Sequence, residues 1–171
     1  DKVTLDLPPG CMVGLIGPDG VGKSSLLALV AGARRLQRGE LQVLGGDMRS
    51  ASHRSHVCPR IAFMPQGLGK NLYPTLSVAE NLVLSRGELP WAIDWKQERA
   101  ALDAFMARMP FKLDIERAVS SLAAGEKQKL EILKQLYLGR RFIILDEPTS
   151  VLTPQEAEEV LGLMQQLAHA G

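Results

Sequence analysis

The sequence of 171 residues has few cysteines, few aromatic residues and almost no net charge. Its two cysteines are too few for a disulfide framework, which predicts a reducing compartment. No apolar run approaches the roughly 18 to 20 residues that cross a bilayer, and no secretory leader opens the chain. With 20 Lys and Arg against 19 Asp and Glu, the sequence has no basic footprint for a nucleic-acid backbone. We therefore expect a cytosolic protein without direct nucleic-acid binding.

The residues that are present indicate one folded domain with a substantial core. Hydrophobic residues make up 46% of the chain and charged residues 23%, which excludes disorder as the main state. Apolar runs of strand length alternate with segments of helical period. This alternation predicts an α/β fold with a largely parallel sheet covered by helices.

Individual elements follow from local patterns. Strands are expected at residues 3–7, 12–16, 41–44, Ile61–Met64 and Phe142–Leu145. Helices are expected at 24–31, after Ser77, at 94–109, around Leu130 and Leu133, and after Thr153. Ser77 with Glu80, and Thr153 with Glu156, have the spacing of capping boxes. Trp91 and Trp95 flank a turn and are interpreted as packing residues, with a docking surface as the alternative.

The middle of the chain differs in character from its two ends. Apolar side chains at 102, 105, 106 and 109 share one helical face, so residues 77–125 are interpreted as a helical insertion. The sequence then divides into a first core segment at 1–76, the helical subdomain at 77–125, and a second core segment at 126–171.

A glycine-rich loop between a predicted strand and a predicted helix matches the phosphate-binding pattern G-x-x-x-x-G-K-[ST]. Its residues are Gly17, Pro18, Asp19, Gly20, Val21, Gly22, Lys23, Ser24 and the following Ser25. Backbone N–H groups of such a loop, together with the start of the next helix, form an anion nest. Lys23 supplies a positive charge for phosphate oxygens, and the Ser24 hydroxyl is a hard ligand suited to Mg²⁺.

Two carboxylates follow the apolar strand Phe142–Leu145. Asp146 at the strand end is suited to hold Mg²⁺, and Glu147 is suited to accept a proton from an attacking water. Gln66, just after the strand Ile61–Met64, could contact the water shell of the metal. Residues 122–128 open a helix whose first N–H groups form a second anion-binding end.

These pieces, in this order and spacing, resemble the ATP-binding domain of ABC-type ATPases over nearly the whole chain. Residues 17–25 resemble the Walker A loop, Gln66 the Q-loop glutamine, and Phe142 to Glu147 the Walker B strand with its catalytic glutamate. Residues 122–128 resemble the signature motif, in which Ala123, Ala124, Gly125 and Glu126 would contact the nucleotide of a partner subunit. Residues 150–153 resemble the D-loop.

The resemblance implies binding and hydrolysis of ATP with Mg²⁺. Glu147, Lys23 and Gln66 would be catalytic, and Ser24, Asp146 and Gln66 would surround the metal. It also implies a head-to-tail dimer with a second nucleotide-binding domain and a transmembrane permease partner. The expected location is then the cytoplasmic face of the cell membrane.

Some features depart from the family pattern. Ala123 and Ala124 stand where the signature usually has serine and glycine, and Thr153 stands where the D-loop usually has aspartate. Residues 63–73 resemble efflux-type and ribosome-associated ATPases, whereas residues 147–156 resemble importers of simple sugars and nucleosides. The alternatives are an ATPase acting on a soluble target such as the ribosome, or a subunit that binds ATP with little hydrolysis.

The resembled domain is longer than this sequence. Its adenine-stacking aromatic residue would precede Asp1, and its switch histidine would follow Gly171, so we expect a domain truncated at both ends. His169 lies within the predicted last helix and is not interpreted as the switch histidine. The isolated segment is expected to hydrolyse ATP poorly.

Overall fold

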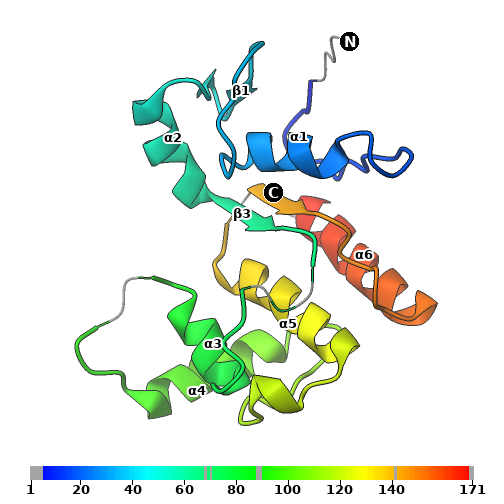
Figure 1. Cartoon of the computed structure of the whole chain (residues 1–171). Coiled ribbons are helices and arrows are strands. Elements are labelled where there is room, and N and C mark those ends of the chain that lie inside the picture. Colours follow the sequence, from blue (N-terminus) through cyan, green and yellow to red (C-terminus); the bar gives the residue numbers. More distant parts are fainter. Residues whose placement is uncertain (1–5, 68, 70, 88–89, 141, 170–171) are drawn as a thin grey trace.

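The computed structural model describes residues 6–67, 69, 71–87, 90–140 and 142–169. In chain order the elements are α1 (Lys23–Val30), β1 (Gln42–Val43), β2 (Gly46–Asp47), α2 (Ala51–Val57), the 3₁₀ helix η1 (Cys58–Arg60), β3 (Ile61–Met64), α3 (Val78–Leu84), α4 (Trp95–Met106), the 3₁₀ helix η2 (Val119–Ser121), α5 (Ala124–Tyr137), β4 (Phe142–Leu145) and α6 (Pro154–His169). Figure 1 shows the pair β3 and β4 at the centre of this arrangement.

Strands β3 and β4 pair in parallel, with Ile61 opposite Phe142 and Met64 opposite Leu145. Both strands have the bounds predicted from their apolar runs, which are typical of strands covered on both faces. The ladder continues one residue further, because the Asp146 N–H donates to the Met64 carbonyl over 2.9 Å. The carboxyl ends of both strands therefore lie at the same edge.

Helices cover both faces of this strand pair. On one face, Leu27 and Val30 of α1 pack against an apolar cluster that contains Ile61 and Ile144. On the other face, Met64 belongs to a larger cluster with side chains of α5. Figure 1 shows the same layering, with α1 on one side of β3 and β4 and α5 on the other.

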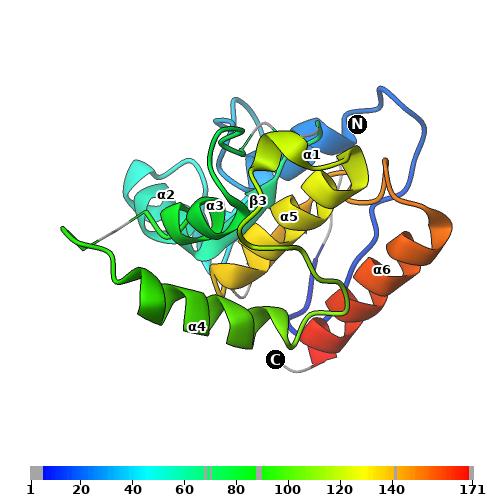
Figure 2. The ribbon, with the colours of Figure 1, turned by 90° about the horizontal axis from the view of Figure 1, so that it is seen from below.

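The helical part of the chain forms around α3, α4 and α5. The predicted capping box at the start of α3 is present, since Ser77 accepts from the Glu80 N–H and Glu80 accepts from the Ser77 N–H. Asp94 is the N-cap of α4, and its side chain accepts from the N–H groups of Lys96 and Gln97. The fully buried Leu102 of α4 joins the cluster of α5 and α6 side chains. Figure 2 shows α5 between α3 and α6.

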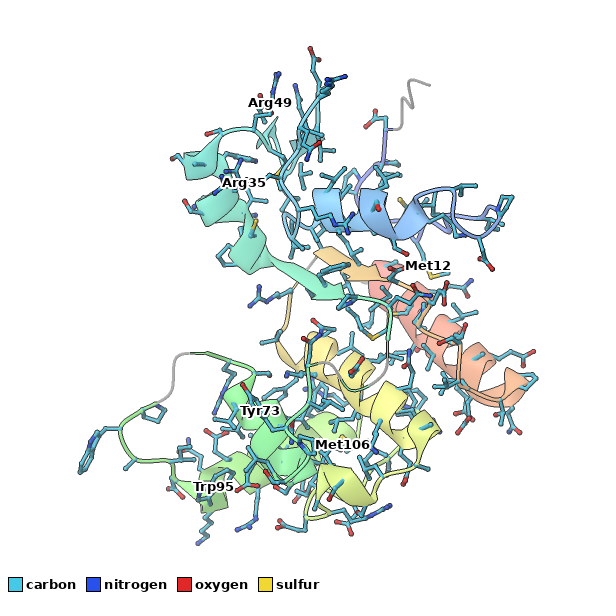
Figure 3. The ribbon with its side chains drawn as sticks, in the orientation of Figure 1. Met12, Arg35, Arg49, Tyr73, Trp95 and Met106 are labelled. Atoms are coloured by element: carbon cyan, nitrogen blue, oxygen red, sulfur yellow. The ribbon has the colours of Figure 1, made fainter. Side chains whose placement is uncertain are left out.

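The two apolar clusters lie on opposite sides of the strand pair. Figure 3 shows Tyr73, Trp95 and Met106 in the helical part, and Arg35 and Arg49 on the side of α2. One cluster contains side chains of α3 and α4 from the predicted helical subdomain together with side chains of α5 and α6 from the predicted second core segment. Because the two segments share this cluster, the domain division at residues 77 and 125 stays a prediction. No helix in the described part of the chain combines the length and apolarity needed to cross a membrane.

The strand predicted at residues 12–16 is wrong. These residues have no regular structure, and the side chains of Met12, Val13 and Ile16 are exposed, Ile16 to 95%. An apolar run forms a strand only where a neighbouring backbone pairs with it, and among the described residues none pairs with this run. Most of the strand predicted at 3–7 lies outside the described residues, and Leu7 is not in a strand.

Smaller differences concern turns and chain segments without strong periodicity. The strand predicted at 41–44 is the short β1, which turns back through Leu44 and Gly45 to pair antiparallel with β2. The helix predicted at 94–109 ends at Met106. The prediction that Trp91 packs is wrong, because its side chain is fully exposed. Trp95 is partly buried against the larger cluster, as the packing prediction requires. Helix α2 was not predicted.

Candidate functional site

The glycine-rich loop leads directly into α1, as predicted. Gly20 and Gly22 have φ angles of 78° and 100°, a left-handed backbone that favours glycine. Gly22 is the N-cap of α1 and provides no side-chain acceptor. The first N–H groups of α1 therefore have neither an intrahelical partner nor a side-chain cap, which favours an anion at this end.

Lys23 is the first residue of α1, and its side chain folds back over the loop. Its ammonium donates to the carbonyl oxygens of Gly17 and Pro18 over 2.7 and 2.8 Å. The carboxylate of Asp19 lies 3.7 Å away and is fully exposed. An exposed ion pair of this kind contributes little, so the loop carbonyls mainly hold the ammonium in place.

One pocket of about 250 Å³ brings together predicted site residues that are far apart in the sequence. Ser24 and Ser25 come from α1, Gln66 from the segment after β3, and Asp146 from the end of β4. Asp146 is only 6% exposed. The remaining lining residues are Ala28, Arg34, Phe63 and Pro65. Hydroxyl, amide and carboxylate oxygens thus share one cavity.

Glu147 stands beside this pocket in an unusual backbone conformation. Its φ of 52° is in the left-handed region, which costs a non-glycine residue on the order of 1–3 kcal/mol. The Gln66 Nε2 donates to the Glu147 Oε2 over 2.8 Å. Such strain persists only where surrounding contacts fix it, and it concentrates at functional sites.

Sequence reasoning missed two contacts at this site, one of Arg34 and one of Gln128, although Gln128 lies in the predicted signature segment. Arg34 was expected to be a solvated helix end, but it lines the pocket and its guanidinium donates to the Ser25 Oγ over 3.1 Å. Gln128 of α5 is 4% exposed and donates to the Pro148 carbonyl over 2.9 Å. No local signal marks the place of Arg34 in the pocket or the contact of Gln128, because both depend on segments that are distant in the sequence.

The signature-like segment lies apart from the pocket. Ala123 is the N-cap of α5 without a side-chain acceptor, and both Ala123 and Ala124 are exposed. The Ala123 N–H donates to the Glu126 carboxylate over 2.8 Å, which lowers the pKa of Glu126, and the Arg117 guanidinium adds to this effect. Gly125 faces the Val151 carbonyl.

The loop that resembles the D-loop ends in the predicted capping box. Thr153 accepts from the Glu156 N–H through its hydroxyl, and its own N–H donates to Glu156. The Lys129 ammonium lies 2.5 Å from the Glu156 carboxylate. This bond, together with the Thr153 N–H, lowers the pKa of Glu156 to about 2. The pair connects α5 to the first turn of α6.

The chain is similar to curated import proteins over its whole length. It is 35% identical over 174 residues to the ribose import ATP-binding protein RbsA 2 of Rubrobacter xylanophilus, covering 100% of this chain and 33% of that protein. It is 35% identical to the arabinose import ATP-binding protein AraG of Burkholderia pseudomallei, covering 34% of that protein. The chain therefore spans about a third of the length of these relatives.

Solved structures and a family model agree with this similarity. The dimeric post-hydrolysis structure of the ATP-binding cassette MJ0796, bound to ADP and Pi, matches with a TM-score of 0.80 at 24% identity, covering 97% of this chain and 73% of that one. This match confirms the predicted P-loop α/β fold. The family model described as ABC transporter matches residues 1–150. The chain therefore belongs to the ABC transporter family, as an ATP-binding domain.

Proposed function

We propose that this chain binds ATP together with Mg²⁺ and hydrolyses it to drive import of a small polar solute. One observation carries the proposal: a single pocket contains Ser24, Gln66 and Asp146, with Glu147 immediately beside it. These residues come from three separate segments of the chain. The oxygen atoms of Ser24, Asp146 and Gln66 suit a metal ion bound to phosphate, and the carboxylate of Glu147 suits a water molecule.

The start of α1 is the phosphate-binding end of the site. Its first N–H groups point out of the helix without a side-chain cap, and the helix dipole favours negative charge there. The Lys23 ammonium, now on the carbonyls of Gly17 and Pro18, is the charge that would move to phosphate oxygens. Neutralising phosphate charge in this way is the main task of such a loop.

The oxygen atoms that line the pocket fit Mg²⁺. Hard hydroxyl, carboxylate and amide oxygens of Ser24, Asp146 and Gln66 are its preferred ligands, and Mg²⁺ typically takes only one or two protein groups besides phosphate and water. When bound, the metal would withdraw negative charge from the phosphate oxygens. The low exposure of Asp146 strengthens its attraction for a cation.

Glu147 is the proposed general base for the attacking water. Its carboxylate is exposed at the edge of the pocket, and the hydrogen bond from Gln66 orients it. The base removes the water proton as the oxygen attacks the terminal phosphorus, and Lys23 and the loop N–H groups stabilise the developing charge.

The partners follow from the proposed reaction and the relatives. We propose a head-to-tail dimer, because Ala123 and Ala124 are exposed outside the pocket, at the start of the signature-like segment, where a second copy can face them. A transmembrane partner would carry the solute, and the chain would act on the cytoplasmic side, where ATP is available. Import of a monosaccharide is favoured because RbsA 2 and AraG are ribose and arabinose import proteins.

A Glu147→Gln substitution in the full-length protein tests the proposal. We expect ATP affinity to stay within about three-fold of the wild type while phosphate release falls at least about 100-fold, as expected for loss of a general base. Glu158→Gln, an exposed change on α6, is the control and should leave both values unchanged. Undiminished phosphate release in Glu147→Gln would contradict the assignment of the base.

A second candidate is a subunit that binds ATP with little hydrolysis. It is favoured by the start of α5, where Ala123 and Ala124 provide no hydroxyl for a nucleotide held by a second copy. Wild-type protein that binds ATP but releases phosphate no faster than Glu147→Gln would support this candidate.

A further inference from the structure

The buried amide of Gln128 contacts the segment that carries Glu147. Gln128 is the fifth residue of α5 and is 4% exposed. Its Nε2 donates to the Pro148 carbonyl over 2.9 Å, and the Glu147 carbonyl lies at 3.4 Å from the same nitrogen. Because a buried amide needs partners, this contact fixes the position of the 147–148 backbone relative to α5.

Glu147 needs such a contact, because the strand pairing ends just before it. The last ladder bond joins Asp146 to Met64, and Glu147 then adopts a φ of 52° in front of Pro148. Among the described residues, the turn itself provides one long backbone bond to Glu147, from the Ser150 N–H to the Glu147 carbonyl at 3.4 Å. A strained conformation of this kind persists only when neighbouring elements hold it.

Two further contacts fasten α5 to the same segment. A Cβ at Gly125 would lie 3.8 Å from both the Val151 carbonyl oxygen and the Leu152 side chain, so the two backbones are close. The Lys129 ammonium lies 2.5 Å from the carboxylate of Glu156. The start of α5 therefore cannot shift without displacing residues 147–156.

We propose that Gln128 is a positioning residue for ATP hydrolysis, which fixes the backbone of Glu147 and carries displacements of the signature segment to it. This inference rests on the proposed function. Gln128 does not line the pocket and touches no reacting atom; it acts through the carbonyls of Pro148 and Glu147, and the bond to Pro148 is the shorter of the two. The Glu147 side chain is held separately by Gln66, so the backbone and the carboxylate have different supports.

A purely structural role for Gln128 makes a different prediction. A buried amide that only satisfies the core would lower the free energy of unfolding when replaced, and it would leave kcat of the folded protein unchanged. A positioning residue changes kcat and local backbone protection without changing ATP affinity.

The test compares Gln128→Met with Gln135→Met in the full-length protein. Methionine keeps the length of the side chain and removes the donor, so the fold should tolerate it. Gln135 is a matched control, since it lies two turns later on α5, is 6% exposed and, in the described chain, bonds to neither Glu147 nor Pro148. Amide hydrogen exchange over 147–152 and steady-state phosphate release are both measured.

We expect exchange over 147–152 to be at least about five-fold faster in Gln128→Met than in wild type or Gln135→Met, and kcat to fall about ten-fold or more with ATP affinity within about three-fold. If exchange over 147–152 or kcat is unchanged in an active Gln128→Met protein, the positioning inference is overturned and the proposed function is not. A wild type that neither binds ATP nor releases phosphate overturns the proposed function, and with it the positioning role of Gln128.

Discussion

The Gln66 side chain donates a hydrogen bond to the Glu147 carboxylate over 2.8 Å, although the two residues lie 81 positions apart in the sequence. The parallel register of β3 and β4 produces this contact, because Met64 and Leu145 end their strands opposite each other. Gln66 and Glu147 each come two residues after the end of their strand, so both lie at the same edge of the sheet. The orientation of the proposed base is thus fixed by strand pairing.

Replacing Gln66 by alanine removes the donor that orients Glu147. We expect kcat for phosphate release to fall about ten-fold, because loss of orientation is felt mainly in the chemical step. Gln97→Ala is the control, since Gln97 is exposed on α4. Steady-state assays of both variants, with a fluorescent ATP analogue for affinity, check this. Equal kcat in Gln66→Ala and Gln97→Ala would show that the 2.8 Å bond does not matter for turnover.

Arg34 adds a positive charge to the pocket that contains Ser25, Gln66 and Asp146. Since the guanidinium is exposed, its contribution to phosphate binding is modest, about 1 kcal/mol, or about five-fold in affinity. We therefore expect Arg34→Gln to weaken ATP binding about five-fold, with a smaller effect at high salt. Arg35→Gln is the matched control, because Arg35 is the next residue, its side chain is exposed, and it does not line the pocket. Equal affinities of the two variants at low salt would contradict a role for Arg34.

The sequence predicted well the elements that depend on local chemistry. Ile61–Met64 and Phe142–Leu145 are apolar runs that end at Pro65 and at Asp146, and both strands have these bounds. The capping boxes of Ser77 and Thr153 formed as expected, because each needs only residues three positions apart.

The failures depend on partners distant in the sequence. Residues 12–16 have the apolarity of a buried strand, yet a strand also requires a paired backbone, which periodicity does not specify. Trp91 is apolar but lies in a turn that carries it away from both clusters. Arg34 and Gln128 belong to the site only because folding places α1 and α5 against the ends of β3 and β4.

The ion pair of Glu156 with Lys129 predicts a defined pH dependence of stability. The Lys129 ammonium, helped by the Thr153 N–H, lowers the pKa of Glu156 from its ordinary 4.5 to about 2. A depressed carboxyl pKa stabilises the fold above pH 4.5, and this contribution is lost as the pH falls from 4.5 towards 2. Glu156→Gln should therefore be less stable than wild type at pH 6, with a difference that shrinks as the pH falls below 4.5.

Denaturant unfolding at pH 6, 4 and 3 measures this difference. The control is Glu158→Gln on the same helix, since Glu158 is exposed and takes part in no ion pair in the described chain. A stability difference between wild type and Glu156→Gln that stays constant from pH 6 to pH 3 would show that the Glu156 carboxylate does not act through its charge.

A serine at position 123 should complete the cap of α5. Ala123 has the extended backbone of an N-cap, with φ of −66° and ψ of 165°, and its N–H already donates to Glu126. A serine hydroxyl there would accept from the Glu126 N–H, so Ala123→Ser should raise the free energy of unfolding by about 1 kcal/mol. Ala124→Ser is the control, because position 124 is the first helical residue and its hydroxyl is not placed to cap. Equal stability of the two variants in denaturant unfolding would contradict the predicted cap.

The same two variants also test the candidate that binds ATP with little hydrolysis. A severalfold rise in phosphate release confined to Ala123→Ser would favour that candidate, because the missing hydroxyl at position 123 would then be what limits the wild type.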